Sequence, residues 1–214
     1  MIALVDAGLG NLRSVERALQ AASDGREEVR LVAGAQGVRD AARVVVPGQG
    51  AFGEAAAALR PDAPLGSALV DAIKSGKPYL GICLGLQVLF VSSEESPGHP
   101  GLGVFPGRVR KLPANMRDDS GRRLKVPHVG WAPIAVRGYH PVFTMPSGDA
   151  WFYFVHSFHA VPEEDKLIVA ITTFGDDPLT AAVARDNVIG VQFHPEKSQE
   201  AGMELLRSFV SWKC

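Results

Sequence analysis

The chain has 214 residues, of which 46% are hydrophobic, enough to bury a full core in one domain spanning residues 1–214. Lys and Arg total 22 against 23 Asp and Glu, a balance that gives no basic surface for nucleic acid or an anionic membrane. Two cysteines do not support a disulfide framework, and no signal peptide or membrane-spanning apolar run is present, so we expect a soluble, cytoplasmic protein.

The first half of the chain alternates predicted strands with predicted helices. Apolar, β-branched runs predict buried parallel strands at residues 2–5, 29–32 and 43–50. Apolar residues at helical spacing predict helices at residues 12–22, 52–60 and 65–75. This alternation indicates an α/β fold, a mostly parallel, doubly wound sheet with helices on both faces and ligands at the carboxyl ends of its strands.

Two glycine-rich turns lie at that edge of the predicted sheet. Gly8-Leu9-Gly10 invites comparison with a phosphate loop, but Arg13 stands where the third glycine of such a loop would be. The turn at residues 47–50 can point a backbone N–H at a neighbouring site, as in an oxyanion hole, or can be a plain connection.

The most informative motif follows a fourth predicted strand, residues 79–82, and reads Gly81-Ile82-Cys83-Leu84-Gly85. Apolar residues at helical spacing continue from Leu84 to Phe90, so we expect a strand, a sharp turn and a helix. This is a nucleophile elbow with sulfur in place of the usual hydroxyl, and the helix N-terminus would stabilise a Cys83 thiolate. The alternative is a buried structural cysteine.

The second half of the chain has a different texture. Residues 92–101 read as a loop, and strand-like segments follow at residues 107–112, 125–136, 151–159, 167–174, 179–184 and 189–193. We expect this half to add antiparallel strands to one edge of the sheet.

The last of these strands delivers His194-Pro195-Glu196. Pro195 fixes the backbone so that Glu196 can project to the same side as His194, and an imidazole oriented by a carboxylate suits a nucleophilic thiol. Taken alone, the pattern also fits a strand-end histidine beside a solvated glutamate; together with the elbow it predicts a triad of Cys83, His194 and Glu196.

The other histidines do not predict a metal site. His156 and His159 lie in an aromatic, strand-like run without a Cys pair or an acidic partner at ligand spacing, and His128 and His140 flank prolines.

The elbow together with His194-Pro195-Glu196 resembles the class I, triad-type glutamine amidotransferases, which hydrolyse glutamine and pass ammonia to a synthase. Six segments in order also resemble the amidotransferase subunits of imidazole glycerol phosphate synthase, which act in histidine biosynthesis: residues 10–15, 47–50, 81–87, 126–131, 153–158 and 192–198. The resemblance implies no cofactor, and a heterodimer with a (β/α)₈ cyclase subunit that receives the ammonia.

The resemblance also implies roles for individual residues. Cys83 would form a γ-glutamyl thioester, His194 would protonate departing ammonia and later activate water, and Glu196 would orient His194. The oxyanion would rest on backbone N–H groups of Leu84 and, after a peptide reorientation, Gln49.

Two further sets of residues follow from the same resemblance. Glutamine's amino and carboxylate groups would be bound by Gln87, Glu95, Ser157 and Phe158, although Gln87 and Glu95 can also be read as surface residues. The cyclase would be faced by Asn11, Trp131, Tyr153 and Lys197; the aromatic pair could equally be core residues.

Three alternatives remain open at this point. The chain could be the glutaminase subunit of another class I amidotransferase, such as pyridoxal phosphate synthase, although residues 10–15 and 128–131 fit that subunit poorly. It could be a stand-alone γ-glutamyl cysteine hydrolase, active without a partner, or a binding module on the same fold, which would normally lack a complete triad.

Overall fold

The computed structural model describes residues 1–214 except 9, 119, 138, 144–149 and 176, so Leu9 of the first glycine-rich turn lies outside it. The strands are β1 Ile2–Val5, β2 Val29–Val32, β3 Arg43–Gly48, β4 Tyr79–Cys83, β5 Phe90–Ser93, β6 Phe105–Lys111, β7 His128–Val136, β8 Ala150–His156, β9 Phe158–Pro162, β10 Ile168–Phe174, β11 Asp177–Arg185 and β12 Val188–Val191. The helices are α1 Leu12–Ser23, α2 Ala35–Asp40, α3 Phe52–Ala58, α4 Pro64–Lys74, α5 Leu84–Gln87 and α6 Gln199–Ser211, with short 3₁₀ turns at Asp165–Leu167 and Pro195–Lys197.

Within these residues, nine strands form a large sheet in the order β2-β1-β3-β4-β12-β11-β10-β7-β8. The pairs from β2 to β12 are parallel and those from β12 to β8 are antiparallel. The expected α/β fold, with antiparallel strands from the second half at one edge, is therefore confirmed. Because β4 and β12 are neighbours, their carboxyl ends bring Cys83 and His194 together.

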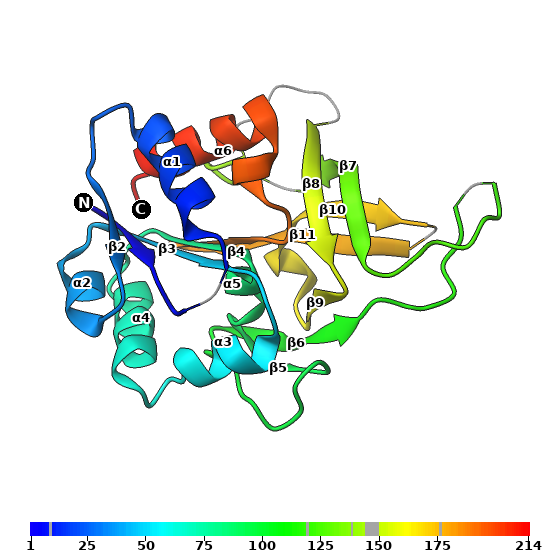
Figure 1. Ribbon diagram of the computed structural model, residues 1–214, viewed down its shortest axis with the longest axis horizontal. Coiled ribbons are helices and arrows are strands. Elements are labelled where there is room, and N and C mark those ends of the chain that lie inside the picture. Colours follow the sequence, from blue (N-terminus) through cyan, green and yellow to red (C-terminus); the bar gives the residue numbers. More distant parts are fainter. Residues whose placement is uncertain (9, 119, 138, 144–149, 176) are drawn as a thin grey trace.

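Helices cover both faces of the parallel part of this sheet (Figure 1). On one face, α1 and α6 pack on Ile2 and Leu4 of β1; on the other, α2, α3 and α4 pack on Ala3 and Val5. Successive residues of one strand thus enter two different cores, because side chains alternate across a sheet. This double burial explains why the parallel strands read as uninterrupted apolar runs.

A second sheet, which the sequence did not predict, has the order β5-β6-β9 among the described residues. The predicted helix through Phe90 is wrong, because α5 ends at Gln87 and the chain continues into β5. The single strand expected at residues 151–159 is also wrong. It divides at Ser157 into β8 of the large sheet and β9 of the small one.

The helices α2 and α6 were not predicted either. In α2, Gly37 packs so closely on Val32 that an added Cβ would lie 2.6 Å from that side chain, which explains a glycine inside a helix. In α6, Leu205, Leu206 and Phe209 are fully buried against the sheet.

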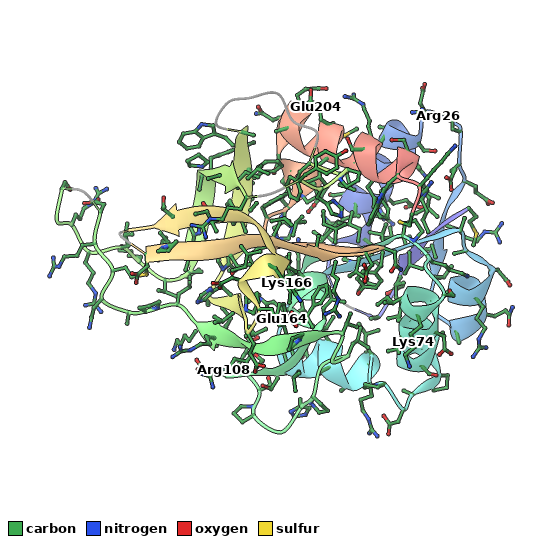
Figure 2. All side chains as sticks on the ribbon, turned by 180° about the vertical axis from the view of Figure 1, so that it is seen from behind. Arg26, Lys74, Arg108, Glu164, Lys166 and Glu204 are labelled. Atoms are coloured by element: carbon green, nitrogen blue, oxygen red, sulfur yellow. The ribbon has the colours of Figure 1, made fainter. Side chains whose placement is uncertain are left out.

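Charged side chains of both signs are spread over separate elements of the surface (Figure 2). Glu204 lies on α6, Lys74 at the end of α4 and Arg108 on β6, while Lys166 forms an ion pair with Glu164 at 2.7 Å. None of the helices in the described part of the chain is long and apolar enough to cross a membrane.

Candidate active site

The turn from β4 into α5 has the geometry expected of a nucleophile elbow. Cys83 has φ 54° and ψ −104°, a conformation that costs a non-glycine residue free energy. A Cβ on Gly81 would lie 2.4 Å from the carbonyl oxygen of Gly85, and one on Gly85 would lie 1.8 Å from that of Val46. Both positions therefore require glycine, and their close packing holds Cys83 at the carboxyl end of the strand.

Cys83 opens into a cavity of about 300 Å³, a size suited to a small molecule. Most of the predicted site residues meet here. The lining includes Gln49, Cys83, Leu84, Gln87, Glu95, Ser157, Phe158 and His194. Gln49 lies beside the nucleophile because Gly48, the residue before it, pairs with Cys83 across β3 and β4.

His194 lines this cavity and forms a buried pair with Glu196. His194 Nδ1 donates to Glu196 Oε1 at 2.9 Å, and the two side chains are 2% and 1% exposed. Burial by itself lowers the pKa of His194, but interactions with Cys83 and then with Glu196 outweigh it and raise the pKa to about 9. The imidazole is therefore held largely in its charged form at neutral pH.

With Nδ1 bound to Glu196, Nε2 is the nitrogen left to meet Cys83. Nε2 makes no well-formed hydrogen bond within the described part of the chain, although the thiol is close enough to affect the pKa of His194. A loose contact of this kind is common before substrate binds, and it tightens when the reacting groups are brought together.

Gln87 does more than line the cavity. Its Nε2 donates to the carbonyl oxygen of Phe158 at 3.0 Å and to Oε1 of Gln192 at 3.2 Å. Gln192, which the sequence analysis missed, is fully buried, and its Nε2 donates to Cys83 Sγ at 3.5 Å. The available signal was a polar residue inside the apolar run Val191-Gln192-Phe193.

Glu95 places a carboxylate on the cavity wall, anchored at one oxygen. Its Oε2 accepts a hydrogen bond from the backbone N–H of Phe52 at 2.8 Å, and its own backbone N–H donates to Ser93 Oγ at 3.1 Å. The first contact fixes the side chain and the second the backbone of Glu95, in the same cavity lining as Gln49.

A buried serine, also missed from the sequence, ties the His194 turn to β8. Ser198 Oγ donates to the carbonyl oxygen of His194 at 2.6 Å and accepts from the backbone N–H of Tyr153 at 3.0 Å. The backbone N–H of His194 donates to the carbonyl oxygen of Tyr153 at 2.9 Å. Three hydrogen bonds thus link the backbone of His194, directly and through Ser198, to Tyr153 of β8.

The residues assigned to the partner surface do not line the main cavity. Trp131 and Tyr153 pack edge to face with their ring centroids 6.1 Å apart, and Lys197 Nζ lies 5.8 Å from the Tyr153 ring. Trp131 is 42% exposed, so it is not a core residue. Asn11 lines a second cavity of about 10 Å³, whose lining also includes His194 and Glu196.

Three other histidines, His128, His140 and His156, are buried and held neutral. Burial lowers the pKa of His128 and of His140 to about 4, and burial together with nearby imidazoles lowers that of His156 to about 3. Among the described residues, no group of three or more His, Cys, Asp or Glu side chains could hold a metal ion.

Comparisons with known proteins show the family and the fold of the chain. A family model described as "Glutamine amidotransferase class-I" matches residues 3–212, so the chain belongs to the class I glutamine amidotransferases. The solved structure of PurLQS from Thermotoga maritima aligns with a TM-score of 0.72 over 97% of this chain and 96% of that chain, at 21% identity. A crystal structure of a glutamine amidotransferase aligns with a TM-score of 0.69 at 19% identity, covering 94% of each chain. These two likenesses show the fold.

Comparison with curated relatives identifies the branch of the class I family that the chain resembles. The imidazole glycerol phosphate synthase subunit HisH of Nitrosomonas europaea is 45% identical over 99% of this chain and 98% of its own length. The HisH subunit of Thermococcus kodakarensis is 44% identical over 98% of each. Within its class, the chain thus groups with the HisH subunits of imidazole glycerol phosphate synthase.

Proposed function

We propose that this chain is the glutaminase subunit of an imidazole glycerol phosphate synthase, and that Cys83, His194 and Glu196 are its catalytic triad. The observation that carries the proposal is that one cavity is lined both by Cys83, at a nucleophile elbow, and by His194, whose Nδ1 binds the buried carboxylate of Glu196. The similarity to HisH subunits supports the choice of synthase.

In the first half of the reaction, the Cys83 thiolate attacks the side-chain amide carbon of glutamine. The electron pair of the breaking C=O bond moves to oxygen, giving a tetrahedral oxyanion. When that oxyanion collapses, the C–N bond breaks and His194, charged at neutral pH, gives the nitrogen a proton. The products of this half are ammonia and a γ-glutamyl thioester on Cys83.

In the second half, neutral His194 takes a proton from water as the water oxygen attacks the thioester. The C–S bond breaks, glutamate leaves, and the thiolate–imidazolium pair is restored. Glu196 stabilises the charged imidazole and fixes its orientation throughout, as the third member of a triad does.

Backbone donors and the cavity wall supply the rest of the site. The N–H of Leu84, at the start of α5, would bind the oxyanion together with the N–H of Gln49 after its peptide reorients. Glu95 would bind the substrate ammonium group, and the Ser157–Phe158 backbone the carboxylate. Gln87, which lines the same cavity, would bind glutamine together with these groups, and its hydrogen bond to the Phe158 carbonyl holds that backbone in place.

Ammonia is of use only if a synthase receives it. We propose that the surface containing Asn11, Trp131, Tyr153 and Lys197 binds a (β/α)₈ cyclase subunit in a heterodimer, through which ammonia is channelled. The cyclase, a lyase, would make imidazole glycerol phosphate and aminoimidazole carboxamide ribotide. A nucleophilic thiol must stay reduced, which favours the cytoplasm as the location.

The test is glutamate release from glutamine by the purified chain alone, with the cyclase subunit, and with cyclase plus its nucleotide substrate. Strong stimulation that needs both additions is the expected result, because the Gln49 peptide would turn inward only in the complex. Equal rates in all three would refute the partner assignment and leave a stand-alone γ-glutamyl hydrolase.

Replacing Cys83 by Ala separates catalysis from assembly. We expect the Cys83→Ala complex to lose glutamine-dependent synthesis and to keep synthesis from added ammonium salts, since the cyclase site is untouched. Loss of both activities would mean that Cys83 is needed for assembly.

A further inference from the structure

The side-chain amide of Gln192 makes a contact with the nucleophile that the triad chemistry does not use. Its Nε2 lies 3.5 Å from Cys83 Sγ, and the side chain is fully buried. Burying an amide costs free energy unless its hydrogen bonds are made, and an apolar side chain would fill the same space without that cost. The buried position of the Gln192 amide therefore indicates a chemical role.

The orientation of this amide follows from a chain of hydrogen bonds that starts at a backbone carbonyl. The carbonyl of Phe158 can only accept, so the end of Gln87 that meets it must be the NH₂ group. The second N–H of that group donates to Oε1 of Gln192. The other end of Gln192, the NH₂ group, is consequently the end that faces Cys83.

We propose that Gln192 is a fourth catalytic residue, whose amide N–H stabilises the Cys83 thiolate; the catalytic role rests on the proposed glutaminase function. Cys83 faces the cavity but is only 7% exposed, so water supplies only part of the stabilisation that a sulfur anion needs. A hydrogen bond from a neutral donor to an anion is stronger than one to a neutral acceptor, which favours thiolate over thiol.

Gln192 transfers no proton in this scheme. The thiol proton goes to His194, and both N–H bonds of the Gln192 amide stay intact. As the sulfur electron pair forms the C–S bond, negative charge leaves sulfur for the carbonyl oxygen and the Gln192 contact weakens. It is restored when the C–S bond of the thioester breaks and thiolate leaves.

The test is the pH dependence of Cys83 alkylation by iodoacetamide in a Cys214→Ser background. Cys214 is the other cysteine of the chain and is exposed, so its removal makes the reaction report Cys83 alone. We expect Gln192→Met, of similar shape, to raise the midpoint of the alkylation profile by about 1–2 pH units, the worth of one hydrogen bond to a charged group. Gln192→Glu, which places a carboxylate near sulfur, should raise it at least as far.

Asn187→Leu is the matched control, because it removes another buried amide. Its Nδ2 donates to the carbonyl oxygens of Ile73 at 2.9 Å and Lys77 at 2.6 Å, outside the cavity. We expect this variant to lose stability and to keep the wild-type alkylation midpoint. A midpoint that moves as much in Asn187→Leu as in Gln192→Met would overturn the proposal.

A second variant keeps the test decisive if Gln192→Met does not fold. Gln87→Met removes the anchor of Gln192 and leaves Gln192 itself intact, so the midpoint should rise by a smaller amount. If the Gln192 variants fold and keep the wild-type alkylation midpoint, the proposed role of Gln192 is refuted. If only Gln87→Met folds, a wild-type midpoint in that variant refutes it. Alkylation needs neither glutamine nor a partner, so it tests the contact separately from the reaction. A shifted midpoint, in a chain that hydrolyses no glutamine even with the cyclase subunit and its nucleotide substrate present, would reject the proposed function and support the Gln192–Cys83 contact.

Discussion

Gly85 offers a prediction in which two physical effects have opposite signs. It lies inside α5, where intrinsic helix propensity favours Ala over Gly by about 1 kcal/mol. Packing opposes this, because an added Cβ would lie 1.8 Å from the carbonyl oxygen of Val46, and real Cβ contacts essentially never fall below 3.0 Å. The two backbones would have to separate by more than 1 Å.

That separation is costly because both partners are backbone. Val46 is held in β3 by its pairing with Gly81 of β4, so neither side can move without disturbing the elbow or the centre of the sheet. Overpacking costs about 1–3 kcal/mol when neighbouring side chains can adjust, and more when they cannot. We therefore expect Gly85→Ala to lose about 3 kcal/mol or more, which lowers Tm by about 6–12 °C.

The assay is equilibrium unfolding in urea together with a thermal melt, with Gly34→Ala as the comparison. Gly34 precedes α2, has no atom within 4 Å of an added Cβ, and should lose at most about 1 kcal/mol through the N-cap preference. A Gly85→Ala protein as stable as wild type would show that propensity decides and that the elbow relaxes at little cost, contrary to our reasoning.

Three further predictions concern other parts of the molecule. Ser198→Ala and Ser23→Ala each remove a serine that is 1% exposed and forms hydrogen bonds with one backbone carbonyl and one backbone N–H, so each variant should lose about 1–3 kcal/mol of stability in urea unfolding. Only Ser198→Ala should also lower kcat for glutamine, because it frees the His194 turn. Equal losses of kcat in the two variants would contradict this. Between pH 6.5 and about 4 the unfolded chain binds a proton at His128 that the folded chain does not, so stability falls as the pH falls, by at most about 1.4 kcal/mol per pH unit for this group. His128→Phe should remove this share of the slope and leave the shares of His140 and His156, and an unchanged slope would contradict the reasoning. Trp131→Ala should change the stability of the free chain little, because the ring is 42% exposed, but should weaken cyclase binding by about 10-fold or more in calorimetry; unchanged affinity would move the partner surface elsewhere.

The sequence could predict those parts of the fold in which the environment of a segment in the folded chain dictates a recognisable local sequence pattern. The parallel strands and the elbow glycines are of this kind: burial on both faces requires uninterrupted apolar residues, and a close approach of backbones requires glycine. The segment from Val88 to Phe90 shows the limit. All three residues are essentially buried, and such a short run cannot distinguish a helix from the start of β5.

The candidate site shows the same division. Cys83 and the His194–Glu196 pair follow recognisable motifs, whereas Gln192 and Ser198 each have a partner more than 40 residues away in the chain. Their contacts depend on β12 lying next to β4 and on β8 reaching the His194 turn. At Ser157 the chain passes from β8 of the large sheet to β9 of the small sheet, which brings the Phe158 carbonyl to Gln87. This change of sheet also depends on tertiary contacts that the local sequence does not show.

The hydrogen bonds between the His194 turn and Tyr153 have a consequence for the solubility of the chain. β8 is one of the two edge strands of the large sheet, and Val129, Trp131 and Trp151 are exposed on β8 and its neighbour β7. An open strand edge beside apolar side chains is a template for aggregation. At Tyr153, however, the backbone N–H and carbonyl are already occupied by Ser198 and His194. The turn that orients the imidazole thus also closes the middle of this edge, and variants that loosen it should be sought in the insoluble fraction as well as in the rate assay.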